Sequence, residues 1–214
     1  MSDEPLTGAT DRDEERDREL ETQLIERREA ALAHVIKWGD PVLKSKASPV
    51  SSFGPELRSE VERMIQIMRD GLGVGLAATQ VGILRRLLVF QAGPDSEPTA
   101  LVNPEIEWTS EELALAEEGC LSLPRVTMDV ERPLFVRVSG RDAEGERIAI
   151  EAAGLEARVL QHEIDHLDGV LILDRTTRAQ RKGALRALRS GGSYSPEEPE
   201  PGDEGELREP RTDA

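Results

Sequence analysis

The segment His162-Glu163-Ile164-Asp165-His166 has the residue types and spacing of a hydrolytic metal site. Histidines four residues apart on a helix lie on one face, with Cβ atoms about 5–6 Å apart, so both imidazoles can reach one metal ion. Glu163 is one position further around the helix and can reach a water bound to that metal. Two core histidines matching this pattern by chance are the alternative, but the chain has only three histidines and two are here. We therefore predict that His162 and His166 are metal ligands and that Glu163 transfers protons.

A catalytic metal of this kind needs a third protein ligand and an open position for water. The chain after His166 offers none, because it contains no histidine and residues 175–190 contain no acid. The third ligand must therefore lie upstream, and the candidates are Cys120, Glu117, Glu118 and His34. A lone cysteine is more often a small buried hydrophobe. Cys120 is nevertheless the best candidate, because a thiolate is the softest ligand available for a transition metal.

Residues 71–80, GLGVGLAATQ, form a third segment of interest. Part of it matches the G-x-G-x-x-A pattern of nucleotide-binding proteins, but that pattern requires a preceding strand and a following helix. A helix is predicted before it here, which excludes the nucleotide-binding interpretation. Two interpretations remain: a tight turn with packed alanines, or a loop whose backbone and Gln80 amide line a site.

Hydrophobic periodicity predicts the helices that position these residues. In residues 55–70 the apolar side chains recur at helical spacing, with Pro55 in the first turn and Gly71 just past the end. Residues 155–167 form a second helix that is apolar on most sides and is therefore expected to be buried. Residues 177–189 are expected to form a basic helix, and residues 19–36 can form a charged one. Short apolar runs between turn residues predict strands at 86–90, 100–102, 134–138 and 147–151.

The net charge of −16 is concentrated at the ends of the chain. Residues 1–30 carry 11 acids and 5 bases, and residues 191–214 carry 8 acids and 2 bases. We expect an acidic, largely disordered extension at 1–30, a catalytic domain at 31–190 and an acidic low-complexity tail at 191–214. A single cysteine excludes an intrachain disulfide and suits a reducing cytosol. No signal sequence and no membrane span are expected, since no run approaches the roughly 20 apolar residues that a span requires.

Three motifs together resemble the signatures of the bacterial peptide deformylase family. They are GVGLAATQ at 73–80, EGCLSLP at 118–124 and QHEIDHLDG at 161–169, and the resemblance extends over about residues 33–175. It implies an α+β fold with antiparallel strands around a central buried helix that carries H-E-x-x-H, to which our own assignment adds a C-terminal helix. It also implies a cytoplasmic enzyme that removes the N-formyl group from the N-terminal methionine of new polypeptides and releases formate.

The resemblance also implies a role for each matched residue. Cys120, His162 and His166 would hold one divalent metal, usually Fe2+ in the family, with Zn2+, Ni2+ or Co2+ as substitutes. Glu163 would be the general base and acid, while the Gln80 amide and the Leu121 N–H would stabilise the oxyanion. Gly75 would help to hold the substrate backbone, and an apolar pocket that includes Val74 and Val159 would receive the methionine side chain. Glu118 would also be among the substrate-binding residues.

One position departs from the family pattern. Many bacterial members have an arginine there that is thought to brace the glutamate before the Gly-Cys pair, and this chain has Thr127. Arg125 and Arg132 are the candidates to replace it, and the role of Glu118 depends on which of them does so.

Two alternative functions and one partner remain to be tested. The alternatives are an endoprotease that uses the same metal chemistry and an inactive homologue that binds ribosomes. Residues 175–189 carry six cations and no acid, which suits docking to ribosomal RNA near emerging formylated chains. A solvated helix that packs Leu185 and Leu188 on the body is the simpler interpretation. We expect neither DNA nor a membrane as a partner.

Overall fold

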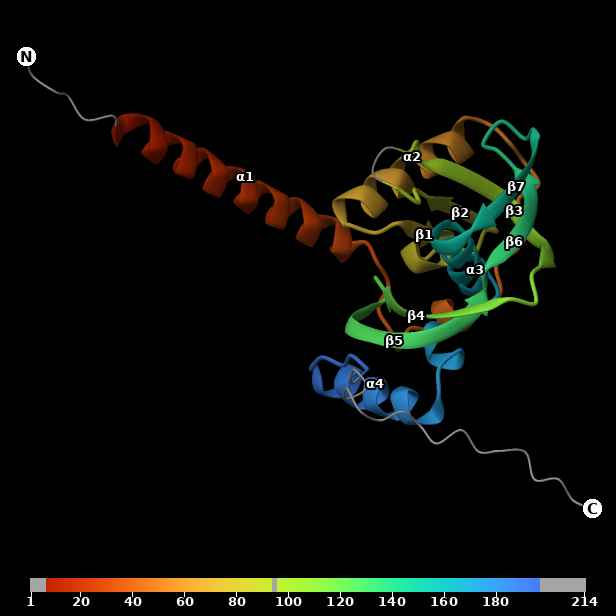
Figure 1. Ribbon diagram of the computed structural model, residues 1–214. Coiled ribbons are helices and arrows are strands. Elements are labelled where there is room, and N and C mark those ends of the chain that lie inside the picture. Colours follow the sequence, from red (N-terminus) through yellow and green to blue (C-terminus); the bar gives the residue numbers. More distant parts are fainter. Residues whose placement is uncertain (1–6, 94–95, 197–214) are drawn as a thin grey trace, which may run out of the picture.

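The computed structural model describes residues 7–93 and 96–196, and it has the mixed helical and antiparallel architecture that the sequence predicts (Figure 1). The helices are α1 (Thr7–Ala33), α2 (Pro55–Asp70), α3 (Gly154–Leu167) and α4 (Arg178–Ser190), with short 3-10 turns η1 (Pro41–Lys44), η2 (Ala78–Val81) and η3 (Ile172–Asp174). The strands are β1 (Gly75–Ala77), β2 (Leu87–Phe90), β3 (Thr99–Thr109), β4 (Leu113–Cys120), β5 (Leu123–Pro133), β6 (Phe135–Arg141) and β7 (Arg147–Ala153). No helix of the described part is long and apolar enough to cross a membrane.

Helix α3 occupies the centre of the structure, between a sheet and a separate hairpin (Figure 1). The sheet has five antiparallel strands in the order β1-β2-β3-β6-β7, and β4 pairs only with β5. Ala157, Leu160 and Leu167 of α3 are fully buried against the sheet residues Leu88 and Val138. The helix predicted at 155–167 is therefore buried as expected, and its histidines are positioned by apolar contacts along most of its length.

Two further apolar clusters attach α2 and α4 to this centre. Met64 and Met68 of α2 pack on Leu76 and Val89, on the opposite side of β1 and β2 from α3. Ala184 and Ala187 of α4 pack beneath β5 and η3. The helices predicted at 55–70 and 177–189 are thus confirmed within one residue at each end. The four predicted strands are present and mostly longer, whereas β1, β4 and β5 were not predicted.

Helix α1 begins earlier than the helix that the sequence predicts. That helix was expected from Glu19, within an extension at 1–30 that we expect to be largely disordered, and α1 starts at Thr7 and projects from the body (Figure 1). The sequence has no glycine or proline from Ala9 to Trp38, so nothing in it interrupts helical hydrogen bonding. Near its end, Ala31 is buried, and α1 contacts α2. Most of the predicted acidic tail, residues 197–214, lies outside the described residues.

Candidate active site

Three side chains from two elements meet where the end of β4 faces α3. One ligand atom from each of Cys120, His162 and His166 lies within 4.8 Å of the other two. The Cys120 Sγ is 3.2 Å from His166 Nε2, and the two imidazole rings are 5.0 Å apart at 66°. The helical spacing of the histidines brings their rings together, while the pairing of β4 with β5 brings in the sulfur from 42 residues upstream of His162.

The donor set and its surroundings fit a transition metal. Burial would raise the pKa of the Cys120 thiol, but the charges and hydrogen bonds of His166 and His162 lower the pKa well below its ordinary value, which favours thiolate. Within the described residues, the buried Glu163 Oε2 and His166 Nδ1 have no hydrogen-bond partner. A metal ion with a coordinated water beside Glu163 would supply the missing partner of that carboxylate.

The other candidates for the third ligand are directed elsewhere. Glu117 is exposed on β4 and accepts a hydrogen bond from Ser195 Oγ at 2.8 Å. His34 is exposed at the end of α1, with its Nδ1 3.5 Å from the Arg63 guanidinium. Glu118 faces His162 rather than the point where the three donor atoms meet. Cys120 is thus the candidate that geometry supports.

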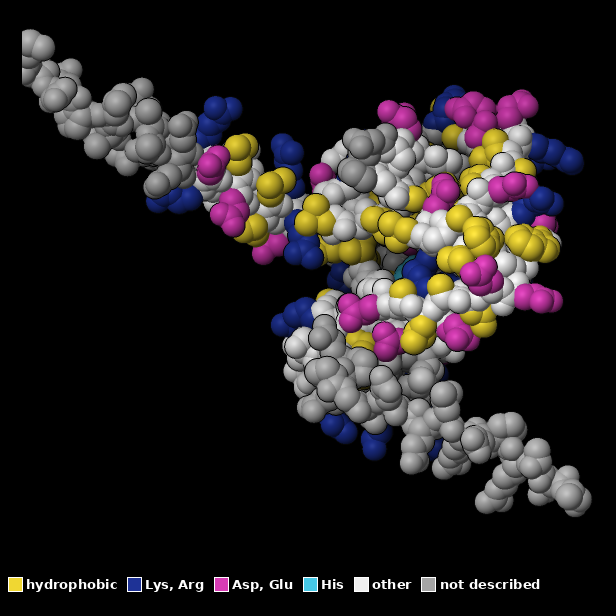
Figure 2. All heavy atoms as spheres, viewed as in Figure 1, with side chains coloured by type: hydrophobic (Ala, Val, Ile, Leu, Met, Phe, Trp, Pro, Cys, Tyr) yellow, Lys and Arg dark blue, Asp and Glu magenta, His cyan; other side chains and the backbone are white. Residues whose placement is uncertain are grey.

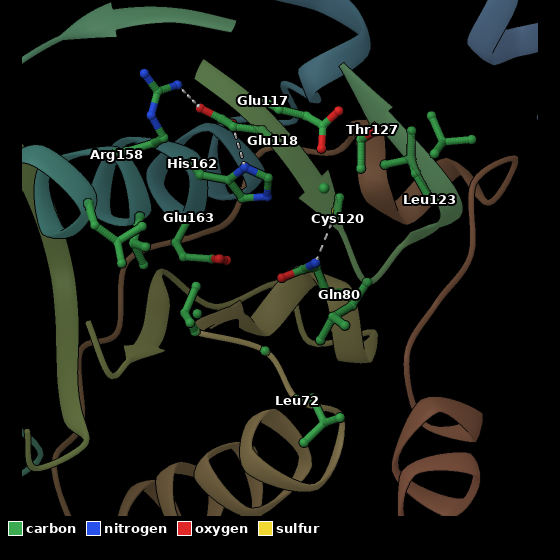
Figure 3. Close-up of a pocket in the computed structure, with 18 of the residues that line it drawn as sticks. Leu72, Gln80, Glu117, Glu118, Cys120, Leu123, Thr127, Arg158, His162 and Glu163 are labelled. Atoms are coloured by element: carbon green, nitrogen blue, oxygen red, sulfur yellow. Dashed lines mark hydrogen bonds and ion pairs between the residues drawn. The ribbon is translucent and has the colours of Figure 1, made fainter. Parts of the chain in front are cut away.

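Glu118 holds His162 in place, and two arginines hold Glu118 although position 127 is a threonine. Its Oε2 lies 2.9 Å from His162 Nδ1, and its two oxygens accept hydrogen bonds from Arg132 at 2.6 and 3.0 Å and from Arg158 at 2.6 Å (Figure 3). Burial would raise the pKa of Glu118, but the hydrogen bonds from His162 and Arg132 lower it to about 2. The brace is therefore Arg132, while Thr127 hydrogen-bonds to Ser195.

Glu118 was expected beside the substrate and does line the cavity, and its hydrogen bonds show how its carboxylate is used. A carboxylate has about four acceptor positions, and these four hydrogen bonds use them. Its side chain is only 5% exposed. Glu118 is consequently a positioning residue: it directs Nδ1 of His162 away from the site and leaves Nε2 to face Cys120 and His166.

Arg132 connects Glu118 of β4 to a second carboxylate, Asp165 of α3. Its Nη1 donates to Asp165 Oδ2 at 2.8 Å, and Arg175 Nε donates to the same oxygen at 3.1 Å. Arg158 also donates to the Val130 carbonyl, at 2.8 Å. Sequence reasoning named Arg132 only as one of two substitutes and did not find Arg158 or Asp165. No spacing rule connects these residues, since they come from β5 and α3.

Gln80 presents its amide N–H groups to the site. Its Oε1 accepts a hydrogen bond from the Ala77 N–H at 2.8 Å, so its Nε2 faces Cys120 Sγ at 3.5 Å and Ser122 Oγ at 3.4 Å. Leu121 lies in the turn that directly follows Cys120, and its carbonyl accepts from Lys37 Nζ at 3.1 Å. Gln80 and Leu121, the two residues expected to stabilise the oxyanion, thus both lie next to Cys120.

The glycine-rich segment 71–80 passes directly beside Glu163. A Cβ atom at Gly75 would lie 2.4 Å from Glu163 Oε1, so only glycine lets the backbone approach the carboxylate this closely. Glu163 is 4% exposed, and burial raises its pKa even though His162 and His166 act in the opposite direction. A raised pKa suits a carboxylate that must both take and return a proton.

The site opens into a cavity of about 420 Å³, which Figure 2 shows as a hollow with a histidine at its base. Its wall includes the apolar side chains of Val74, Leu155 and Val159 as well as Gly75, and Figure 3 shows Glu163 and His162 directed into it. Val74 is 48% exposed and Val159 is 5% exposed, so the apolar wall runs from the surface to the interior. Such a cavity suits an apolar side chain.

Comparisons with known proteins match this region of the chain. The family model described as polypeptide deformylase matches residues 32–182. The chain is 48% identical over 144 residues to a peptide deformylase of Thermotoga neapolitana, covering 67% of this chain and 87% of that relative. It is 43% identical over 151 residues to a peptide deformylase of Parafrankia sp., covering 71% and 82%.

Solved structures resemble it as well. The peptide deformylase from Synechococcus elongatus in complex with actinonin has a TM-score of 0.69 and 42% identity, covering 74% of this chain and 88% of that one. The peptide deformylase from Thermotoga maritima has a TM-score of 0.65 and 45% identity, covering 67% and 96%.

Proposed function

This chain belongs to the peptide deformylase family, whose members remove the formyl group from the N-terminal formylmethionine of new polypeptides, and we propose which of its residues perform this reaction. The observation that carries the assignment is the meeting of Cys120, His162 and His166 beside Glu163, whose buried Oε2 has no hydrogen-bond partner in the described part of the chain. The site residues and their roles below are our proposal.

Cys120, His162 and His166 hold one divalent metal ion. When bound, such an ion lowers the pKa of a coordinated water toward about 7 and supplies a nucleophile at neutral pH. A thiolate with two imidazoles is compatible with Fe2+, Zn2+, Ni2+ or Co2+. We assign Fe2+ as the native metal on the basis of the family. Glu118 and Arg132 hold His162 in the orientation that binding requires.

Glu163 moves the protons of the reaction. It takes one from the attacking water, and it returns one to the amine nitrogen when the bond between that nitrogen and the formyl carbon breaks, so that formate leaves. Negative charge that develops on the formyl oxygen is stabilised by the Gln80 Nε2–H and the Leu121 backbone N–H. Removing one such donor typically costs about 3 kcal/mol of transition-state stabilisation.

The cavity selects for methionine and for a formyl group. Val74, Leu155 and Val159 line the wall that would receive the methionine side chain, and the backbone at Gly75 passes close enough to hold the substrate main chain. The formyl carbon carries only hydrogen, so bulkier acyl groups would meet the crowded surroundings of Glu163. The substrates are nascent formylmethionyl chains, and we propose the cytoplasm as the place of the activity.

One preparation tests both metal and activity. The protein is purified anaerobically, its metals are measured by elemental analysis, and formate release from formyl-Met-Ala-Ser is followed. We expect about one iron per chain and rapid release of formate, with no cleavage of an internal-peptide substrate. Cleavage of that peptide without formate release would instead support an endoprotease, and the absence of both activities in metal-loaded protein would support an inactive homologue.

We further propose that α4 docks on ribosomal RNA. Arg175 and Arg181 are paired with Asp165 and Asp174, but Arg178, Lys182, Arg186 and Arg189 are exposed and have no acidic partner among the described residues. Four such cations could neutralise several phosphates and make binding dependent on salt.

Co-sedimentation with ribosomes at low salt is the test of this docking. We expect binding by the intact chain, stronger binding after truncation at Pro196 because that removes the acidic tail, and loss of binding when Arg178, Lys182 and Arg186 are replaced by Gln. Failure of both the intact and the truncated chain to co-sediment would leave α4 with a structural role only.

A further inference from the structure

The segment after α4 is attached to the wall of the catalytic cavity, although it lies beyond the residues 32–182 that match the family. The Tyr194 N–H donates to the Arg125 carbonyl at 3.0 Å, and the Thr127 N–H donates to the Tyr194 carbonyl at 2.9 Å. Tyr194 thereby forms a parallel bridge with Val126 at the start of β5. The segment at Tyr194 adds a further hydrogen-bonded stretch to this end of the hairpin.

Packing fixes this segment from the other side. The Tyr194 ring belongs to the apolar cluster beneath β5 and lies on α4 at Gly183. A Cβ atom at Gly183 would be 2.3 Å from Tyr194 Cε2, so the ring occupies the space that any other residue would fill. Tyr194 is therefore anchored by its backbone and by its side chain, and the next residue, Ser195, has a defined position.

Ser195 connects two residues of the cavity lining. The Thr127 Oγ1 hydroxyl donates to Ser195 Oγ at 3.0 Å, and Ser195 Oγ donates to Glu117 Oε2 at 2.8 Å. Glu117 and Thr127 both line the cavity, and Figure 3 shows the Glu117 carboxylate directed toward Thr127. The Glu117 carboxylate is consequently held beside the cavity by a residue that the family match does not include.

The Glu117 carboxylate lines the cavity and is free to pair with a basic group of the substrate. Arg158 is bound to Glu118, and Arg125 donates to the Gly191 carbonyl at the end of α4. Glu117 is exposed and has no basic partner among the described residues. Asp129 faces it across the hairpin register, and Figure 2 shows acidic side chains below the hollow. Glu117 and its register partner Asp129 thus place two carboxylates on this part of the hairpin, while the Arg125 guanidinium also lines the cavity and keeps its charge, because a carbonyl does not neutralise it.

We propose that Glu117 is a specificity-determining residue, positioned by Ser195, that favours formylated chains with lysine or arginine in the first three residues after methionine. The inference rests on the proposed function, in which the formyl group lies at Glu163 and the following residues leave the cavity past its wall. A basic side chain there meets the Glu117 carboxylate, whereas an acidic one meets a like charge.

The test compares kcat/KM for formyl-Met peptides that carry a single Lys or a single Glu at each of the next three positions. We expect the metal-loaded, full-length protein to prefer Lys about threefold to tenfold at one position at least, on the scale of a partly exposed ion pair, and less at high salt. In Glu117→Gln the Lys-to-Glu ratio of kcat/KM should fall to about one, because the side chain no longer carries a charge.

Two further variants complete the experiment. Ser195→Ala should lose part of the preference, because the carboxylate is no longer held, and Glu62→Gln, an exposed acid on α2, should retain all of it. An unchanged Lys-to-Glu ratio in Glu117→Gln overturns the proposal, and an unchanged ratio in Ser195→Ala overturns the positioning by Ser195. Failure to hydrolyse formyl-Met-Ala-Ser at all would refute the proposed function instead.

Discussion

Replacing Arg132 by methionine removes a buried cation shared by two carboxylates. Arg132 is 4% exposed and binds Glu118 through two nitrogens, at 2.6 and 3.0 Å, and Asp165 through the third, at 2.8 Å. Methionine retains much of the apolar length of the side chain, so Arg132→Met tests the charge more than the packing. We expect a large loss of stability because the carboxylates remain buried.

The size of this loss follows from what the carboxylates retain. Breaking a buried ion pair by removing one partner typically costs about 3–5 kcal/mol. Glu118 retains Arg158 and Asp165 retains Arg175, so we expect a loss of about 3 kcal/mol, at the lower end of that range. Without Arg132, Glu118 also holds the His162 ring less firmly, and loss of such support typically lowers metal affinity about 10–100-fold.

The interaction between Arg132 and Glu118 should also appear in how the stability changes at acid pH. The pKa of Glu118 is lowered from an ordinary 4.5 to about 2. A lowered pKa in the folded state means that the stabilisation is fully present above pH 4.5 and is lost as the pH falls toward 2. Removing Arg132 raises this pKa, so the contribution of Glu118 should be smaller in the variant, and its loss should be complete at a higher pH than in the original protein.

The assay is urea unfolding in the presence of a chelator, so that metal affinity does not contribute to the free energy of unfolding. The control is Arg137→Met: Arg137 binds Glu151 at 2.6 Å, but the two side chains are 50% and 75% exposed. An exposed pair contributes at most about 1 kcal/mol. Equal losses for the two variants, or a loss below about 1 kcal/mol for Arg132→Met, would refute the argument from burial.

Three other substitutions test the site directly. Cys120→Ala should lose tight metal binding, because two imidazoles leave the site incomplete. Full metal occupancy of this variant by elemental analysis would mean that another residue is the third ligand. Glu163→Gln should keep its metal but lose about 10²–10⁴-fold in kcat, and loss of metal from the folded variant would contradict a role in proton transfer alone. Gly75→Ala places a Cβ atom 2.4 Å from Glu163 Oε1 and should lower kcat at least about tenfold by displacing a general base. Gly54→Ala, whose Cβ meets nothing within 4 Å, is its control, and equal kcat values would show that Glu163 adjusts freely.

The helices and two of the metal ligands could be predicted from the sequence because both depend on local spacing. The apolar period that predicted residues 55–70 is the face that packs on β1 and β2, and Pro55 and Gly71 mark its ends. His162 and His166 lie together because the helix itself places them so. Cys120 was selected by the chemistry of the available donors, and the structure brings its sulfur to the histidines.

The hairpin of β4 and β5 was not predicted, although residues 126–131 of β5 alternate apolar and polar side chains as a half-buried strand does. Its partner β4 lacks that alternation, and Glu118 and Arg132 point inward from the two strands as charges. These charges become acceptable in the interior only when each meets its partner. The pairing is set by the strand register, which a single segment of sequence does not contain.

Local pattern and long-range assembly thus determined different parts of the active site. The sequence determined the types of donor, the helix that carries His162, Glu163 and His166, and the glycine-rich segment that passes them. Only the tertiary structure decided that Arg132 rather than Arg125 braces Glu118, and that Ser195 reaches Glu117 at the cavity. Helical neighbours are fixed by bonds within one short stretch of chain, whereas the partners of a buried or rim charge depend on which distant strands and segments are packed together.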